Sequence, residues 1–251
     1  MSDKLNGKRA LVTAGAQGIG LAISRALLDA GCNVAVHYFS SADAANELKA
    51  KFGDRVEVLQ ADLTDSAQTE QMVNKAVESL GGLEILINNA GSLIARRRLE
   101  EIDMEFWQTV NDVNVTSMLN VTKFASPALR AANGASVVNL ASLAGRKGGH
   151  PGSLAYSTAK GATLTMTRAM SNELGPDGVR VNALAPGLIL ETSFHETHTT
   201  KESAAQTIAG IPLGRAGNPN DVAHAAIFLA EQFDGFITGA TLDINGGVYS
   251  A

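Results

Sequence analysis

The first glycine-rich stretch of the chain reads Thr13-Ala14-Gly15-Ala16-Gln17-Gly18-Ile19-Gly20. It follows a short apolar run at 10–13 and opens a segment at 19–30 whose apolar residues recur at helical spacing, which predicts a strand, a tight turn and a helix. Gly18 and Gly20 would let backbone amides and the helix N-terminus approach a pyrophosphate. Because plain loops also use such glycines, this stretch alone leaves both a binding site and an ordinary turn open.

The same alternation of short apolar runs and longer helical segments continues to the C-terminus. The runs predicted to be strands are 10–13, 34–36, 56–59, 85–87, 136–140, 179–183 and 240–244. The segments predicted to be helices are 19–30, 66–80, 105–132, 156–174 and 219–231. Strands alternating with helices predict an α/β fold of the Rossmann type, a doubly wound parallel sheet with helices on both faces.

Composition limits the class of protein. The chain has 251 residues, of which 45% are hydrophobic and 18% charged, enough to bury one sizeable core. A net charge of -5 gives no support to a nucleic-acid partner. The single Cys32 excludes an intrachain disulfide, and no run is long enough for a membrane span or a signal peptide. We therefore expect a cytoplasmic protein without a membrane or nucleic-acid partner.

Polar residues follow several of the predicted strands, where a doubly wound sheet binds its ligands. Asp62 and Leu63 come after the third strand, and the Asp62 carboxylate could accept a hydrogen bond from an adenine amino group. The alternative for Asp62 is a helix cap or a turn former. Asn88 and Asn89 end the fourth strand, where an ordinary turn would use asparagine as well.

A tyrosine and a lysine are spaced to share one helix face. Tyr156 lies four residues before Lys160 and fourteen after Ser142. A free phenol has a pKa of about 10, and a neighbouring cation favours phenolate. Such a phenol could pass a proton to or from a carbonyl or alcohol oxygen held by the serine hydroxyl. An isolated Tyr-Lys pair at this spacing is more often a plain surface pair. No His, Cys or carboxylate cluster at ligand spacing suggests a metal.

Taken together, in this order and at these separations, the motifs resemble the short-chain dehydrogenase/reductase family across nearly the whole chain. The resemblance implies one dinucleotide-binding and catalytic domain over 1–251, with a substrate lid at about 188–210. It implies that Tyr156 is the general acid/base, that Lys160 lowers its pKa and holds the nicotinamide ribose, and that Ser142 orients the substrate oxygen. Asn114 matches the helix asparagine that holds a proton-relaying water in the family.

The resemblance also implies a nicotinamide cofactor. The residues expected to bind it are Gly15, Gln17, Gly18, Ile19, Gly20, Asp62, Leu63, Asn89, Ala90, Gly91, Tyr156, Lys160, Pro186, Gly187, Ile189 and Thr192. Ala14 stands where the first glycine of the family's turn usually lies. The second strand ends without a carboxylate, and hydroxyls at Ser40 and Ser41 with a possible cation at His37 slightly favour NADP(H) over NAD(H).

Cations mark the expected substrate end. Arg96, Arg97 and Arg98 follow the strand-four asparagines, and His150 and His195 lie in later loops. They could pair with a substrate carboxylate, or form a solvated basic turn and a polar lid. The pattern resembles family reductases of sugar-derived keto acids such as deoxy-hexoseulose uronates.

Other members of the same family remain open as alternatives. The pattern also resembles 3-oxoacyl-acyl-carrier-protein reductases and glucose-type sugar dehydrogenases. The family resemblance further implies a homotetramer. An alternative outside enzymes is a cofactor-sensing or structural subunit, which we would expect to lack part of the set Asn114, Ser142, Tyr156 and Lys160.

Overall fold

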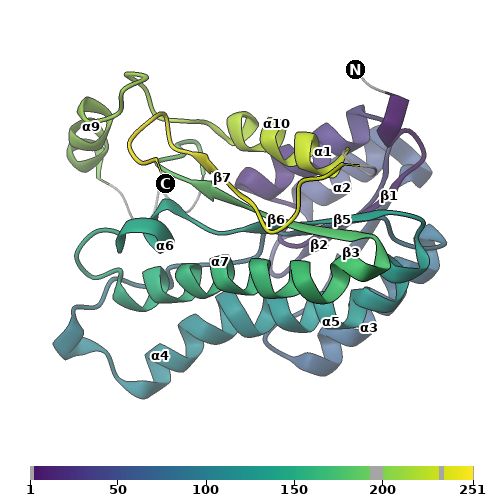
Figure 1. The fold of residues 1–251 in the computed structure, drawn as a ribbon, viewed down its shortest axis with the longest axis horizontal. Coiled ribbons are helices and arrows are strands. Elements are labelled where there is room, and N and C mark those ends of the chain that lie inside the picture. The colour runs from purple at the N-terminus through teal and green to yellow at the C-terminus, as the bar shows by residue number, and fades with distance from the viewer. Residues whose placement is uncertain (1–2, 193–199, 232–234, 251) are drawn as a thin grey trace.

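The structure is a computed structural model that describes residues 3–192, 200–231 and 235–250. Its centre is a seven-stranded parallel sheet in the order β3-β2-β1-β4-β5-β6-β7 (Figure 1). The strands are β1 Arg9–Val12, β2 Asn33–Tyr38, β3 Val56–Gln60, β4 Ile85–Asn88, β5 Ala135–Leu140, β6 Val179–Pro186 and β7 Thr241–Ile244. Each overlaps a predicted strand, and the doubly wound fold is confirmed.

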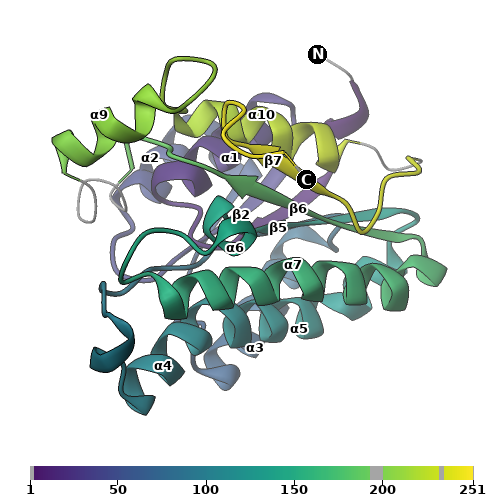
Figure 2. The same ribbon diagram turned by 60° about the vertical axis from the view of Figure 1, so that its left-hand side comes forward.

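Helices cover both faces of the sheet, as Figures 1 and 2 show from two directions. One layer contains α3, α5 and α7, and the other contains α1, α2 and α10. The helices are α1 Gly18–Asp29, α2 Asp43–Phe52, α3 Ser66–Leu80, α4 Met104–Asn111, α5 Ser117–Ala131, α6 Leu143–Lys147, α7 Leu154–Leu174, α9 Lys201–Ala209 and α10 Pro219–Ala230.

The two layers pack through two separate apolar clusters. Val12 of β1 joins the cluster that contains Leu27 of α1 and Ala226 of α10. Its neighbour Leu11 joins the cluster that contains Val73 of α3 and Val121 of α5. Successive side chains of a strand point to opposite faces, so a strand covered by helices on both faces is buried at every position. This explains why β5 and β6 are continuous buried runs rather than alternating ones.

Two predictions about helices differ from the structure. The segment predicted as one helix at 105–132 is α4 and α5 joined by a π-helical turn, η4 (Asp112–Thr116). Such turns widen a helix locally and are frequent at functional sites. The sequence interpretation also omitted α2, α6 and α9, because these short helices present few buried apolar residues to reveal a helical period.

The topology decides where a ligand can bind. After β3 the chain crosses back over β1 to form β4, so β1 lies between β2 and β4. All seven strands are parallel, and their carboxyl ends therefore meet at one edge. In such sheets the ligand site lies outside those ends, at the point where strand order reverses. No helix in the described ranges combines the length and the apolar character needed to cross a bilayer.

Candidate active site

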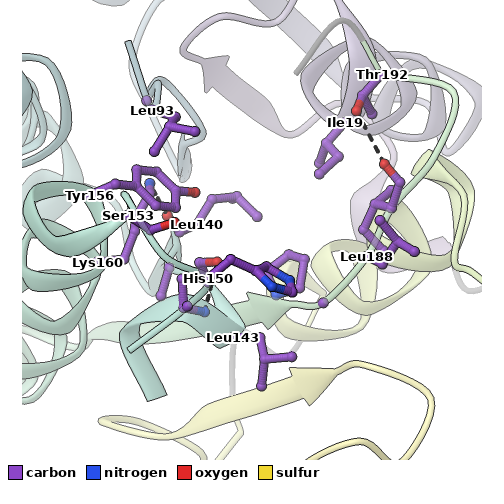
Figure 3. A pocket seen from close by; sticks show the side chains of 18 of the residues that line it. Ile19, Leu93, Leu140, Leu143, His150, Ser153, Tyr156, Lys160, Leu188 and Thr192 are labelled. Atoms are coloured by element: carbon purple, nitrogen blue, oxygen red, sulfur yellow. Dashed lines mark hydrogen bonds between the residues drawn. The ribbon is translucent and has the colours of Figure 1, made fainter. Parts of the chain in front are cut away.

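A cavity of about 390 Å³ lies at this edge of the sheet. Figure 3 shows Tyr156, Ser153 and Lys160 on one side of it, with Ile19, Leu188 and Thr192 across from them. The predicted site residues that line it are Gln17, Gly18, Ile19, Asn89, Gly91, Arg96, Ser142, His150, Tyr156, Lys160, Pro186, Gly187, Ile189 and Thr192. Its size is that of a pocket for a small molecule.

Ser142 and Tyr156 meet inside this cavity. Ser142 begins α6, where its hydroxyl accepts a hydrogen bond from the backbone N–H of Ala144 at 3.1 Å. The same hydroxyl is hydrogen-bonded to that of Tyr156, which lowers the pKa of the phenol. Removal from water has the larger effect and raises the pKa of Tyr156 to about 12. The phenol is therefore protonated at neutral pH.

Lys160 lies one helical turn beyond Tyr156 and is buried, with 4% of its surface exposed. Its ammonium donates to the backbone oxygen of Leu140 at 2.8 Å and lies 5.8 Å from the centre of the Tyr156 ring. Burial lowers the pKa of Lys160 to about 8. The sequence interpretation expected Lys160 to lower the pKa of Tyr156, whereas in the structure the pKa of the phenol is set by burial, which raises it, and by the bond to Ser142, which lowers it less. Both groups lie out of water, which favours the neutral form of each.

Asn114 reaches the same place from the π-helical turn. Its amide nitrogen donates to the backbone oxygens of Ser92 at 2.7 Å and Val110 at 2.9 Å, and its oxygen accepts from the Ser92 N–H at 3.1 Å. A Cβ atom on Gly91 would lie 2.7 Å from the Asn114 oxygen and 2.8 Å from the Lys160 ammonium nitrogen. Asn114 and Lys160 therefore converge on Gly91, and only a glycine fits between them.

The opposite end of the cavity suits the pyrophosphate of a dinucleotide. Helix α1 begins there, and its N-cap residue Gln17 makes no side-chain capping bond. The first amides of a helix otherwise lack partners and carry the positive end of the helix dipole. Gly18, at φ 49°, leaves this end open, while a Cβ on Gly15 would lie 2.8 Å from the Ser24 hydroxyl oxygen. The residues present fit a nicotinamide dinucleotide: Gly18 faces the ligand side, and Gly15 permits close packing.

Asn89 holds this turn in place. Its side-chain nitrogen donates to the backbone oxygens of Thr13 and Ala14, each at 3.1 Å. Its own backbone N–H donates to the Thr13 hydroxyl at 2.9 Å. The strand-end asparagine thus connects β4 to the glycine-rich turn, and it also lines the cavity.

Some predicted cofactor residues lie outside the described cavity lining. The Asp62 carboxylate accepts from the N–H of Thr64 at 2.9 Å and from its hydroxyl at 2.7 Å, which matches the alternative of a turn former. Leu63 packs in the core cluster beside α3. Ser41 donates to the Asp43 carboxylate at 3.1 Å. Gly15, Gly20, Ser40 and Ala90 are likewise absent from the described lining.

His37 differs from the expected cation. It is buried, and its Nδ1 accepts from the N–H of Ala14 at 2.9 Å while its Nε2 lies 3.1 Å from the carbonyl oxygen of Ala61. A ring that accepts at Nδ1 and donates from Nε2 is the neutral tautomer. Burial lowers the pKa of His37 and outweighs the opposite effects of the bond to the Ala61 carbonyl and of the Asp62 charge. The proposed charge on His37 was wrong because the imidazole binds backbone groups on both sides.

The arginines at the substrate end have different surroundings. Arg96 lines the cavity and donates to the Ser153 hydroxyl at 2.8 Å. Arg97 pairs with Asp103 at 2.7 Å and stacks over Phe106, 4.3 Å from the ring centre. Arg98 lines a separate, shallower groove beside the cavity. Among the three, Arg96 alone contributes to the described cavity lining. His195 lies outside the described residues.

The sequence interpretation missed Lys147 and most of the apolar lining. Lys147 ends the short helix α6, and a basic residue in the last turn of a helix is the signal that would have indicated it. Further lining residues not predicted include Leu93, Leu143, Leu188, Ser203, Thr207, Ile211 and Val248. Within the described lining the charged side chains are Arg96, Lys147 and Lys160, with no carboxylate among them.

A metal centre finds no support in the described part of the chain. There, no three His, Cys, Asp or Glu side chains gather where they could hold a metal ion. Structural and catalytic metal sites usually need at least three such protein ligands.

Comparison with known proteins decides the family. Residues 13–249 match the family described as enoyl-(acyl carrier protein) reductase. A 3-oxoacyl-(acyl-carrier-protein) reductase of Staphylococcus aureus is 34% identical over 96% of this chain and 98% of its own length. The solved structure of an NADH-dependent reductase responsible for alginate metabolism superposes with a TM-score of 0.90 at 32% identity, covering 100% of both chains. The chain belongs to the short-chain dehydrogenase/reductase family.

Membership of this family makes the protein an NAD(P)-dependent oxidoreductase. An acetoacetyl-CoA reductase of Shinella zoogloeoides is a further relative, 35% identical over 96% of this chain and 98% of its own length. The expectation of an enzyme is confirmed, and the alternative of a structural or sensing subunit is not favoured. These relatives act on different carbonyl compounds, so the substrate of this short-chain dehydrogenase/reductase must be argued from its own cavity.

Proposed function

We propose that the protein interconverts a ketone or aldehyde and an alcohol on a small, polar, anionic substrate, an oxo-sugar or keto acid such as a deoxy-hexoseulose uronate. The observation that supports this is the charge of the cavity. Arg96 and Lys147 line it together with His150, and its described lining holds no carboxylate. Guanidinium and ammonium groups at a pocket recognise carboxylates. The similar reductase of alginate metabolism also supports a uronate-derived substrate.

In the proposed mechanism the phenol of Tyr156 donates its proton to the substrate carbonyl oxygen as that oxygen gains negative charge. The raised pKa of Tyr156 keeps this proton in place at neutral pH. The Ser142 hydroxyl, bonded to the phenol, orients the same oxygen. The nicotinamide, when bound, supplies or accepts the hydride.

Lys160 and Asn114 complete the proposed proton path. The Lys160 cation lies where it stabilises the phenolate that remains after proton donation, 5.8 Å from the ring centre. Asn114 converges with it at Gly91, where a water could pass a proton onward. Of the cofactor contacts proposed from the sequence, we still propose those made by residues that line the cavity.

The proposed choice of cofactor is NADP(H), slightly preferred over NAD(H), because residues 37–41 hold no carboxylate to repel a 2′-phosphate. The structure weakens the case for NADP(H) over NAD(H). His37 supplies no cation for a 2′-phosphate, and the Ser41 hydroxyl is bonded to the Asp43 carboxylate. The similar alginate-metabolism reductase is described as NADH-dependent. Rates at subsaturating NADH and NADPH test the preference, and a strong preference for NADH would contradict it.

The alternative substrate is a 3-oxoacyl thioester, supported by the reductases of Staphylococcus aureus and Shinella zoogloeoides. A glucose-type sugar is a third candidate from the sequence. The three differ in charge: a uronate-derived keto acid carries a carboxylate, whereas a neutral sugar and the 3-oxoacyl group of a thioester do not. A panel of uronate-derived keto acids, oxo sugars, simple ketones and acyl thioesters, run with both cofactors, separates them.

Removing Arg96 and Lys147, two cations that line the cavity, tests the substrate proposal. Arg96→Ala combined with Lys147→Ala should raise KM for an anionic keto acid about tenfold and change KM for a neutral ketone less than about twofold. Arg98→Ala is the matched control, because Arg98 lines the neighbouring groove and not the cavity. Equal effects of the double substitution on both substrates would contradict a carboxylate role.

Broader predictions about domain organisation, assembly and location accompany this function. We propose that 1–251 form one domain and that the segment at about 188–210 acts as a lid. Its support is that Ser203 and Thr207 of α9 line the cavity. We also propose a homotetramer in the cytoplasm, without a nucleic-acid partner. Light scattering should then give four times the 26.1 kDa mass of the chain.

A further inference from the structure

The glycine-rich turn contains a backbone conformation that its residue does not favour. Ala14 has a φ of 47°, in the left-handed region where a Cβ atom crowds the following carbonyl. Ala14 lines the cavity directly before the amides that would receive the pyrophosphate. Surrounding contacts must therefore hold this residue, since an L-residue rarely keeps such a conformation without them.

His37 makes two of those contacts. Its Nδ1 accepts from the Ala14 N–H at 2.9 Å, and its backbone oxygen accepts from the Gly15 N–H at 2.8 Å. Asn89 holds the other side of the residue, donating to the Ala14 oxygen at 3.1 Å. The donors and acceptors of Ala14 are thus fixed from β2 and from the end of β4.

The far side of the imidazole anchors it to the next strand. Nε2 donates to the backbone oxygen of Ala61 at 3.1 Å, just beyond β3. The ring is buried, with 2% of its surface exposed. Because the ring binds backbone on both sides, it connects the ends of β1, β2 and β3 through one neutral side chain. A proton added to Nδ1 would face the Ala14 N–H and abolish the acceptor.

We propose that His37 is a positioning residue for the cofactor: it holds Ala14 in the left-handed conformation and so shapes the turn that binds the pyrophosphate. A glycine at position 14 would adopt positive φ readily, whereas in this chain the contact from His37 stabilises Ala14 in that conformation. The proposal rests on the nicotinamide dinucleotide that the family uses and not on the identity of the substrate. Cofactor binding therefore tests it, and the result does not depend on whether the substrate proposal is correct.

Two substitutions separate the contact to Ala14 from the contact to Ala61. In His37→Asn the side-chain oxygen lies at the position of Nδ1 and can still accept from Ala14. In His37→Gln the amide nitrogen extends to the position of Nε2 and can still donate to Ala61. Titration calorimetry with NADH and NADPH should give a dissociation constant within about twofold of wild type for His37→Asn, and one about tenfold weaker for His37→Gln.

A second substitution tests the role of Ala14 directly. Ala14→Gly removes the Cβ and should restore the affinity of His37→Gln to within about threefold of wild type, because glycine adopts positive φ readily. Ala14→Gly alone should change affinity less than about twofold. Urea unfolding without cofactor should give each variant a single transition, so the affinities compare folded proteins. Equal losses for His37→Asn and His37→Gln, or no rescue by Ala14→Gly, would overturn the proposal.

Acid pH should act on the same contact. Burial lowers the pKa of His37, and the bond to the Ala61 carbonyl and the negative charge of Asp62 oppose this less strongly. The neutral acceptor is therefore intact at pH 7, and wild-type cofactor affinity should fall once the pH drops below the folded pKa of His37, on the acid side of 6.5. His37→Asn should lose this fall. An unchanged acid fall in that variant would assign it to another group and contradict the proposal.

Discussion

At the scale of residues, burial shifts the pKa values of the two central side chains in opposite directions and away from each other. Burial raises the pKa of Tyr156 to about 12 and lowers that of Lys160 to about 8. The sequence could predict that the two lie on one helix face, because four residues make about one turn. It could not predict how far each is removed from water, since that depends on walls built from distant strands.

The lowered pKa of Lys160 predicts an alkaline limit to carbonyl reduction. Lys160 is a cation below about pH 8 and neutral above it, so the group that stabilises the Tyr156 phenolate is lost as pH rises. We expect kcat/KM for the cofactor, which reports ionisations of the free enzyme, to fall about tenfold per pH unit above about 8.

The matched variant for this prediction is Lys160→Arg. A guanidinium stays charged throughout the accessible pH range. The alkaline fall should therefore vanish in this variant, whatever its overall rate. A wild-type profile that is flat from about pH 7 to 10 would show that the Lys160 charge has no part in the reaction.

His37 and Arg97 show why residue type alone misleads. Both are basic and lie in segments expected to contact a ligand, which suggested that each would pair with a negative charge on the cofactor or the substrate. In the structure His37 is neutral because it accepts from Ala14, and Arg97 is engaged with Asp103 and Phe106. A sequence gives the chemical group, whereas the partner that fixes its charge state comes from another strand or helix.

At the scale of elements, the short helix α6 carries two groups of the site. Ser142 begins it and Lys147 ends it. Arg146 attaches it to β7 by two bonds to the Asp243 carboxylate, each 3.1 Å long, and lies 5.9 Å from the Tyr249 ring centre. Both charged side chains are mostly buried, with 16% and 17% of their surfaces exposed. This ion pair therefore fixes the helix against the sheet.

Removing the pair should cost both stability and substrate binding. We expect Arg146→Ala to lower the free energy of unfolding by about 1–2 kcal/mol and to raise KM for the carbonyl substrate. Arg130→Ala is the control, because the Arg130–Asp177 pair is exposed, at 45% and 44%, and such pairs contribute less than about 1 kcal/mol. Urea unfolding measures both. Equal losses in the two variants would refute a special role for the α6 pair.

The strands were more predictable than the helices for a physical reason. Strands buried on both faces are near-continuous apolar runs, which stand out in a sequence. The junction at 112–116 was hidden because Asp112–Thr116 contains no glycine or proline that would mark a break in the helix. Helix α9 buries no residue fully, so it left no apolar stripe to find.

At the scale of the whole molecule, the parallel sheet brings together residues from Ala14 to Val248 at one edge. The general place of the site followed from strand order, which the sequence predicts. The charge of the cavity could not be predicted from strand order, because Lys147 comes from a short helix and Arg96 from a loop. The substrate class is thus a property of the assembled molecule rather than of one motif.

Cofactor binding should stabilise the whole fold. A ligand at one hundred times its dissociation constant adds about 2.7 kcal/mol to the free energy of unfolding. For a chain of this size that corresponds to a rise in Tm of about 5–10 °C with NADH or NADPH. ADP, which lacks the nicotinamide end, should give a smaller rise. A Tm unchanged by either nicotinamide cofactor would contradict the proposed binding site.

The measurement that tests the account most directly compares wild type with Tyr156→Phe, which removes one hydroxyl. With the best substrate of the panel, reduction should fall by about 10²–10⁴-fold, because the proton donor is lost. The dissociation constant of the cofactor should stay within about twofold, which shows that the site is still formed. A Tyr156→Phe protein that keeps wild-type turnover would contradict the assignment of proton transfer to Tyr156.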